Sequence, residues 1–230
     1  YRIRIMSLKI KNFLSKKNKK KLACLTSYSK SMSQILDKHC DLVLVGDSLA
    51  NVLYGMKTTH NLKLETMIEH AKSVTLGTKK SLVVVDMPKN SYKNPKEALK
   101  NAKLILKKTR CDAIKIENNS INLNIVKTLT KSKIEVMGHI GYTPQFKKKF
   151  KVEGKNPSEE KKLLRYAKKI EKAGAFSIVL ECLFPSSAKL ITEKINIPTI
   201  GIGSSLYCDG QILVTDDMLG ISGFYPKFVK

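Results

Sequence analysis

The sequence has 230 residues and a formal net charge of +24, with 43 lysine and arginine residues against 19 aspartate and glutamate residues. A chain of this length can bury one sizeable core and is typical of a single α/β barrel domain. No run approaches the roughly 18 consecutive apolar residues of a membrane span, so we expect no membrane-spanning segment.

The positive charge does not by itself indicate a nucleic-acid-binding surface. Arginine makes most of the forked contacts to bases and phosphates in such proteins, and here it occurs only at Arg2, Arg4, Arg110 and Arg165. The lysines are spread along nearly every expected helix, which is typical of solvated helix faces. We therefore expect no nucleic-acid partner, and a basic RNA-associated or purely structural protein is the alternative from another class.

Residues 1–21 are polar, basic and free of acidic side chains. This composition predicts a basic N-terminal extension that forms a solvated helix. The remaining residues, 22–230, are then expected to form one catalytic barrel domain.

From Leu22 onward, short apolar runs alternate with segments of helical periodicity. Uninterrupted runs of branched apolar residues predict strands that are buried on both faces. Such strands are expected at residues 22–28, 42–47, 82–86, 113–117, 135–140, 176–181 and 199–203, with an eighth apolar segment within 209–217. Helices are expected between them at residues 29–39, 64–78, 95–110, 121–131, 157–173 and 186–195, and residues 50–63 are expected to form a loop.

This alternation predicts the fold. Strands that alternate with helices run parallel, with right-handed crossovers. Seven or eight such units in about 200 residues favour a closed (β/α)8 TIM barrel over an open doubly wound sheet. The sequence stops at Lys230, soon after the eighth apolar segment, so we expect the barrel to lack its C-terminal closing helix.

Acidic residues stand at the ends of four expected strands, at Asp47, Asp86, Glu117 and Glu181. The C-terminal ends of the strands form the reactive face of such a barrel. Lys115 precedes Glu117 by two residues and therefore shares its side of the strand. Three unpaired carboxylates on neighbouring strands would be costly to bury, and Mg2+ removes that cost because it binds carboxylate oxygens together with water or substrate oxygens. The alternative is that these acids cap helices or pair with some of the many lysines.

The histidines and cysteines add little chemistry. His139 ends the fifth expected strand, where it could hydrogen-bond a substrate or support one of the ligand carboxylates. His39, His60 and His70 receive no role. The five cysteines form no CxxC pair, and several lie in or beside apolar runs, which is typical of buried free thiols in a reducing cytoplasm.

Several short runs, in order along residues 21–230, resemble the ketopantoate hydroxymethyltransferase family. The octapeptide Gly138–Gln145 and the run Cys208–Gln211 are the most distinctive. The other matching runs are Val45–Leu49, Asp86–Pro88, Lys115–Glu117, Leu180–Glu181 and Gly201–Gly203.

This resemblance implies a TIM barrel of the phosphoenolpyruvate/pyruvate type and a homo-oligomer, commonly a decamer. It also implies Mg2+ as the cofactor and 5,10-methylenetetrahydrofolate as a co-substrate. The implied metal ligands are Asp47, Asp86 and Glu117, the implied oxoacid-binding residues are Asp47, Ser48, Asp86 and Lys115, and the implied proton acceptor is Glu181.

The implied reaction transfers a hydroxymethyl group to 3-methyl-2-oxobutanoate through a Mg-stabilised enolate and gives 2-dehydropantoate for pantothenate synthesis. Mg2+ acts as a Lewis acid on the oxoacid, and Lys115 adds positive charge where oxygen charge develops. Glu181 removes the proton from C3. A carbon–carbon lyase or mutase of the same superfamily is the alternative enzyme.

The chain departs from the family pattern at a few positions. Lys89 follows the Asp86–Pro88 run, where the family usually has phenylalanine, and Asp216 stands where histidine is common. Asn118 and Asn119 replace glycines. None of these residues is an expected metal ligand or base, but Lys89 is expected to change the folate side of the pocket.

Overall fold

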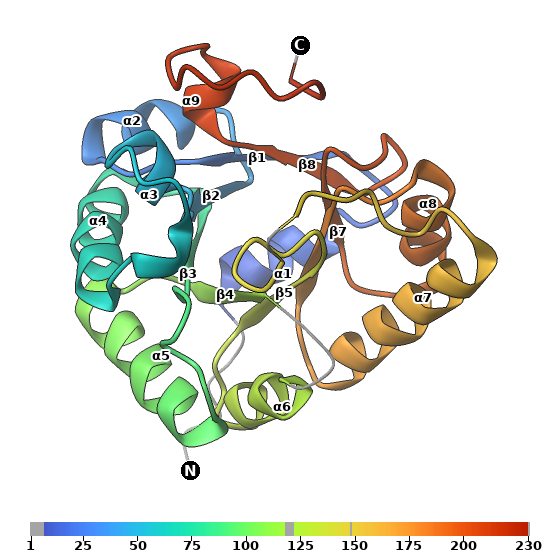
Figure 1. Ribbon diagram of the computed structural model, residues 1–230. Coiled ribbons are helices and arrows are strands. Elements are labelled where there is room, and N and C mark those ends of the chain that lie inside the picture. Colours follow the sequence, from blue (N-terminus) through green and yellow to red (C-terminus); the bar gives the residue numbers. More distant parts are fainter. Residues whose placement is uncertain (1–6, 118–121, 148, 230) are drawn as a thin grey trace.

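The computed structural model describes residues 7–117, 122–147 and 149–229. Its eight strands are all parallel and close into a barrel in the order β1 to β8, with helices around the outside (Figure 1). The predicted (β/α)8 TIM barrel is therefore confirmed.

The element bounds follow the sequence pattern closely. The strands are β1 Leu22–Thr26, β2 Leu42–Val45, β3 Leu82–Asp86, β4 Ala113–Glu117, β5 Val136–Gly141, β6 Ser177–Glu181, β7 Thr199–Ile202 and β8 Gly210–Leu213. The helices are α1 Leu8–Ser15, α2 Lys30–Leu36, α3 Leu49–Val52, η1 Thr59–Asn61, α4 Leu64–Gly77, α5 Pro95–Thr109, α6 Leu123–Lys131, α7 Pro157–Lys172, α8 Pro185–Lys194 and α9 Thr215–Met218.

Three expectations need correction. Residues 50–63 are not a plain loop, because they contain most of α3 and the short helix η1. The first strand ends at Thr26 and does not reach Tyr28. The second strand ends at Val45, so Asp47 lies in the turn that follows it. Ile121, Asn118 and Asn119 lie outside the described residues.

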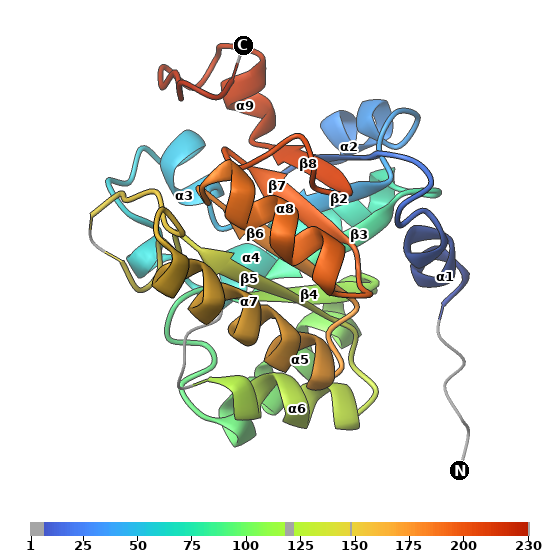
Figure 2. The ribbon, with the colours of Figure 1, turned by 90° about the vertical axis from the view of Figure 1, so that its right-hand side faces the viewer.

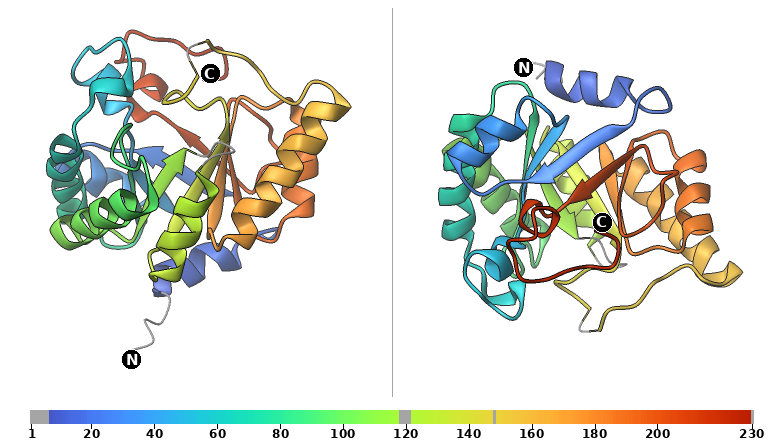
Figure 3. Two further views of the ribbon diagram at one scale, coloured as in Figure 1. Left: turned by 60° about the horizontal axis from the view of Figure 1, so that its bottom comes forward. Right: turned by 90° about the horizontal axis from the view of Figure 1, so that it is seen from above.

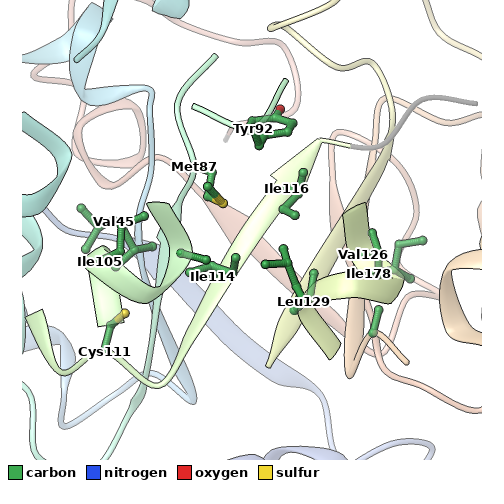
Figure 4. Close-up of a cluster of buried hydrophobic side chains, with 14 of the residues drawn as sticks. Val45, Met87, Tyr92, Ile105, Cys111, Ile114, Ile116, Val126, Leu129 and Ile178 are labelled. Carbon is green, nitrogen blue, oxygen red and sulfur yellow. The ribbon is translucent and has the colours of Figure 1, made fainter. Parts of the chain in front are cut away.

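The barrel has two apolar layers, because successive strand side chains point to opposite faces. Outward-facing residues such as Ile114 and Ile116 pack against the surrounding helices, together with Ile105 of α5 and Leu129 of α6 (Figure 4). Inward-facing residues fill the barrel near the starts of the strands. These include Leu22, Cys24, Leu42, Leu82, Val84, Ala113, Met137, Val179, Ile200 and Ile212.

Helix α1 closes the end of the barrel where the strands begin. Ile10 and Phe13 are buried against the inward-facing side chains, and the Phe13 and Phe176 rings meet edge to face at 5.9 Å. Figure 2 shows α1 at the end opposite α3. Lys9 forms an ion pair with Asp112, and Lys17 forms one with Asp209. These two acids directly precede strands β4 and β8. The expectation of a solvated helix is therefore wrong on this face, because two apolar residues at i, i+3 spacing pack inward among the lysines.

Replacing Phe13 with alanine is expected to destabilise the fold by about 3–5 kcal/mol, because it opens a cavity beneath the barrel. Urea unfolding would measure the change. The matched control is Leu8→Ala on the same helix, where the side chain is 73% exposed and little change is expected. Equal stability of the Phe13→Ala variant and the parent would show that α1 does not contribute to the core.

After β8 the described chain forms the four-residue helix α9 and continues to Val229 without another helix or strand (Figure 3). Within the described ranges, no helix combines the length and apolar character needed to cross a bilayer.

Candidate active site

Charged side chains replace the apolar filling at the C-terminal ends of the strands. On β3 and β4, the inward positions run from Val84 to Asp86 and from Ala113 through Lys115 to Glu117. On β6 the same alternation leads from Val179 to Glu181. The strand period of two therefore delivers these acids and the lysine to one rim of the barrel.

Asp86 connects β2 to β4. Its Oδ2 accepts the backbone N–H of Asp47 at 3.0 Å, and its Oδ1 lies 3.1 Å from Nζ of Lys115. Asp86 and Lys115 are only 3% and 6% exposed. A carboxylate oxygen has more than one lone pair, so Oδ1 can accept another ligand beside its ion pair with Lys115.

Gln145 connects Asp47 to Glu117. Its backbone N–H donates to Oε2 of Glu117 at 2.9 Å, and its side-chain amide donates to Oδ2 of Asp47 at 2.9 Å. Tyr92 donates its hydroxyl to Oε1 of Gln145. The sequence alone predicts no role for Gln145 or Tyr92. Gln145 is the last residue of the distinctive run Gly138–Gln145, and its place in that run could have indicated a function.

His139 lies between Lys115 and Glu181. Its Nε2 is 3.1 Å from Oε2 of Glu181, and its Nδ1 is 3.4 Å from Nζ of Lys115. Burial and the charge of Lys115 hold the pKa of His139 well below its usual value, so the imidazole is neutral. The structure thus places this residue against the expected base.

The carboxylates repel one another in a buried setting. Burial raises the pKa of Asp86 to about 6, against the opposing effect of Lys115. Burial and the charge of Asp47 raise the pKa of Glu117 well above its ordinary value. Burial alone would lower the pKa of Lys115, but Asp86, Asp47 and Glu117 outweigh it and hold that pKa high. When all three carboxylates of Asp47, Asp86 and Glu117 are ionised, their charge exceeds that of the Lys115 ammonium group described among them.

A hard divalent cation fits this charge and the free lone pairs of Asp86 Oδ1. Among the residues that the structure describes, no three histidine, cysteine, aspartate or glutamate side chains are grouped so that they could hold a metal ion by themselves. A cation held here would therefore complete its coordination with water and substrate oxygens, as Mg2+ commonly does. The metal-ligand roles of Asp47, Asp86 and Glu117 stay predictions.

Ser48 lies at the start of α3, directly after Asp47. Its hydroxyl is 2.8 Å from the hydroxyl of Tyr28, another residue to which the sequence reasoning gave no role. Ser48 is therefore held at the same rim as Asp47.

Lys89 extends toward η1. Its Nζ lies 3.2 Å from Nδ1 of His60, and Nε2 of His60 lies 3.0 Å from the carbonyl oxygen of Pro144. A lysine ammonium group only donates, so Nδ1 accepts and Nε2–H donates to Pro144. Lys89 thus supports the loop that carries Gln145. The other departure, Asp216, lies in the first turn of α9.

Solved structures share this architecture. Phosphonopyruvate hydrolase in complex with oxalate and Mg++ superposes with a TM-score of 0.69 at 9% identity, covering 90% of this chain and 81% of the other. A 2,3-dimethylmalate lyase, described as a PEP mutase/isocitrate lyase superfamily member, superposes with a TM-score of 0.69 at 12% identity, covering 93% and 83%. At these identities the likeness concerns the fold alone.

Sequence comparison is more specific. The 3-methyl-2-oxobutanoate hydroxymethyltransferase of Pelagibacter ubique (strain HTCC1062) is 56% identical over 225 residues, which are 98% of this chain and 88% of the relative. The enzyme of the same name from Anaplasma marginale (strain Florida) is 48% identical over 228 residues, covering 98% and 82%. The profile of the family described as Ketopantoate hydroxymethyltransferase matches residues 7–230. The chain belongs to the ketopantoate hydroxymethyltransferase family.

Proposed function

We propose that this chain transfers a hydroxymethyl group from 5,10-methylenetetrahydrofolate to 3-methyl-2-oxobutanoate and gives 2-dehydropantoate for pantothenate synthesis. Family membership and the names of the relatives support this reaction. The observation that carries the proposal is the meeting of Asp86, Lys115 and Glu181 at one rim, with His139 between the last two.

In this proposal Asp47, Asp86 and Glu117 would hold Mg2+, which acts as a Lewis acid on the oxygens of the oxoacid. Lys115 provides a fixed positive charge beside Asp86, where the keto oxygen gains negative charge as C3 loses its proton. With Asp47, Asp86 and Lys115, Ser48 completes the proposed oxoacid-binding set.

Glu181 takes the C3 proton in this scheme. It belongs to β6, whereas Asp86 and Glu117 end β3 and β4, so the base stands apart from the proposed metal ligands. His139 lies 3.1 Å from its carboxylate and can orient it. The C3 carbanion then forms a bond to the one-carbon unit, and both bonds from this carbon to N5 and N10 of the folate break. One water supplies the hydroxyl group, and the proton from C3 and the second proton of the water end on the two nitrogens as tetrahydrofolate leaves.

In the metal-free protein, Glu181 is expected to titrate near pH 7, because burial raises its pKa from 4.5 to about 7 against the opposing charge of Lys115. The carboxylate, which is the active base, therefore predominates only above about pH 7. Carbon-13 NMR of labelled glutamate side chains would measure this, and the Glu181→Gln variant would identify the signal. A midpoint near 4.5 would contradict the buried setting of this base.

The test of the proposed function is direct. The protein is incubated with Mg2+, 3-methyl-2-oxobutanoate and 5,10-methylenetetrahydrofolate, and 2-dehydropantoate is measured by mass spectrometry. Product that depends on both substrates supports the proposal. Cleavage of a 2-oxoacid without use of the folate would favour the lyase or mutase alternative, whose fold this chain shares.

The homo-oligomer and the cytoplasmic location stay predictions.

A further inference from the structure

Gln145 is an uncharged residue at the centre of the acidic cluster, which consists of Asp47, Asp86 and Glu117. It is 1% exposed, and both amide hydrogens and the amide oxygen of its side chain are hydrogen-bonded. The two amide hydrogens go to Oδ2 of Asp47 at 2.9 Å and to the carbonyl oxygen of Met87 at 3.1 Å. Tyr92 donates to the amide oxygen, and the backbone N–H of Gln145 donates to Glu117.

These partners allow one orientation of the amide. Asp47 and the Met87 carbonyl can only accept, so the amide nitrogen must face them. Tyr92 is buried, and burial together with the charge of Glu117 holds its pKa above the usual value, so its hydroxyl stays protonated and donates. A flipped amide would set its oxygen against two acceptors and lose the bond from Tyr92.

The backbone of Gln145 is fixed from the other side. The preceding carbonyl, that of Pro144, accepts from His60, which in turn accepts from Lys89. The peptide that presents N–H to Glu117 is therefore anchored to η1 and to the loop after β3. Both the side chain and the backbone of Gln145 are therefore held by other groups of the protein.

We propose that Gln145 is a positioning residue for the divalent cation, and that it holds the carboxylates of Asp47 and Glu117 in the orientation that receives the ion. The inference rests on the proposed function, which supplies the cation. Two like-charged carboxylates in a buried site would otherwise turn away from each other, and the cation would have to reorient them. Hydrogen-bond donors behind ligand carboxylates reduce this cost, and their loss typically weakens metal binding about 10- to 100-fold.

The first variant is Gln145→Met, which keeps the length of the side chain and the backbone N–H but removes both amide donors. Mn2+ alone is titrated into the metal-free protein and followed by electron paramagnetic resonance, with Mg2+ calorimetry as a second measurement. The dissociation constant is expected to rise about 10- to 100-fold. Tyr92→Phe, which removes only the donor that orients the amide, is expected to give a smaller rise.

The matched control is Gln211→Met on β8, where the amide donates to the carbonyl of Ser205 at 2.8 Å, outside the acidic cluster. This variant should bind Mn2+ like the parent. In Gln145→Met the Tyr92 hydroxyl loses its acceptor, and the double variant Tyr92→Phe/Gln145→Met removes this unpaired hydroxyl as well. The double variant is expected to be at least as stable as Gln145→Met yet to bind Mn2+ as weakly, and the activity of Gln145→Met should recover as Mg2+ is raised.

Three results would overturn the inference. The first is parent-like Mn2+ affinity in Gln145→Met, and the second is parent-like affinity in the double variant. In either case the parent still binds Mn2+ and turns over, so only the role of Gln145 fails. The third is turnover by the parent without saturable binding of Mn2+ or Mg2+, which would remove the cation from the proposed function and the inference with it.

Discussion

Glu181→Gln is expected to slow exchange of the C3 proton of 3-methyl-2-oxobutanoate by about 10²- to 10⁴-fold, the usual contribution of a general base. The amide has nearly the same shape but cannot take a proton. Binding of Mg2+ and the oxoacid should change little, because Glu181 is not among the proposed ligands. Proton NMR in deuterated water measures the exchange, and calorimetry measures the binding.

The matched control is Glu193→Gln on the outer helix α8, where the side chain is exposed and its Oε1 lies 4.0 Å from Nζ of Lys189. It should exchange the C3 proton at the parent rate. Unchanged exchange in Glu181→Gln would remove this residue as the base and leave His139 as the nearest alternative.

Lys115→Met is expected to reduce both turnover and stability. The Lys115 ammonium group forms an ion pair with Asp86, so its loss leaves the Asp86 carboxylate buried without this partner. Breaking a buried pair in this way typically costs about 3–5 kcal/mol of unfolding free energy. Loss of a charge that stabilises a developing oxyanion should reduce kcat by about 10²- to 10³-fold. Urea unfolding of the metal-free protein and the turnover assay check the two effects.

The double variant Asp86→Asn/Lys115→Met separates these effects, because it removes both charges of the pair. It should recover most of the lost stability but not the activity. If Lys115→Met unfolded at the same urea concentration as the parent, the ion pair would not be a significant part of the fold. Retained turnover would exclude Lys115 from the reaction.

The strands and the acids at their ends could be predicted because both are local features. A continuous run such as residues 82–85 indicates a strand buried on both faces, and Asp86 then falls at its C-terminal end. Lys115 and Glu117 follow from the period of two. These rules require no knowledge of distant contacts, and the structure confirms the barrel that they predict.

The supporting residues could not be predicted in the same way. Tyr92 is 53 positions from its partner Gln145, and Gln145 is 98 positions from Asp47. No periodicity encodes such contacts between loops. The burial of Phe13 could not be predicted either, because the apolar face of this lysine-rich segment is short. That face is buried only through its contact with the end of the barrel.

The most direct test is a crystal structure with Mn2+ and 3-methyl-2-oxobutanoate, in which anomalous scattering locates the metal. We expect the ion beside Asp47, Asp86 and Glu117, the oxoacid oxygens on the ion and near Lys115, and the Glu181 carboxylate facing C3. An ion bound away from these carboxylates, or a C3 atom on the side opposite Glu181, would contradict the proposed site.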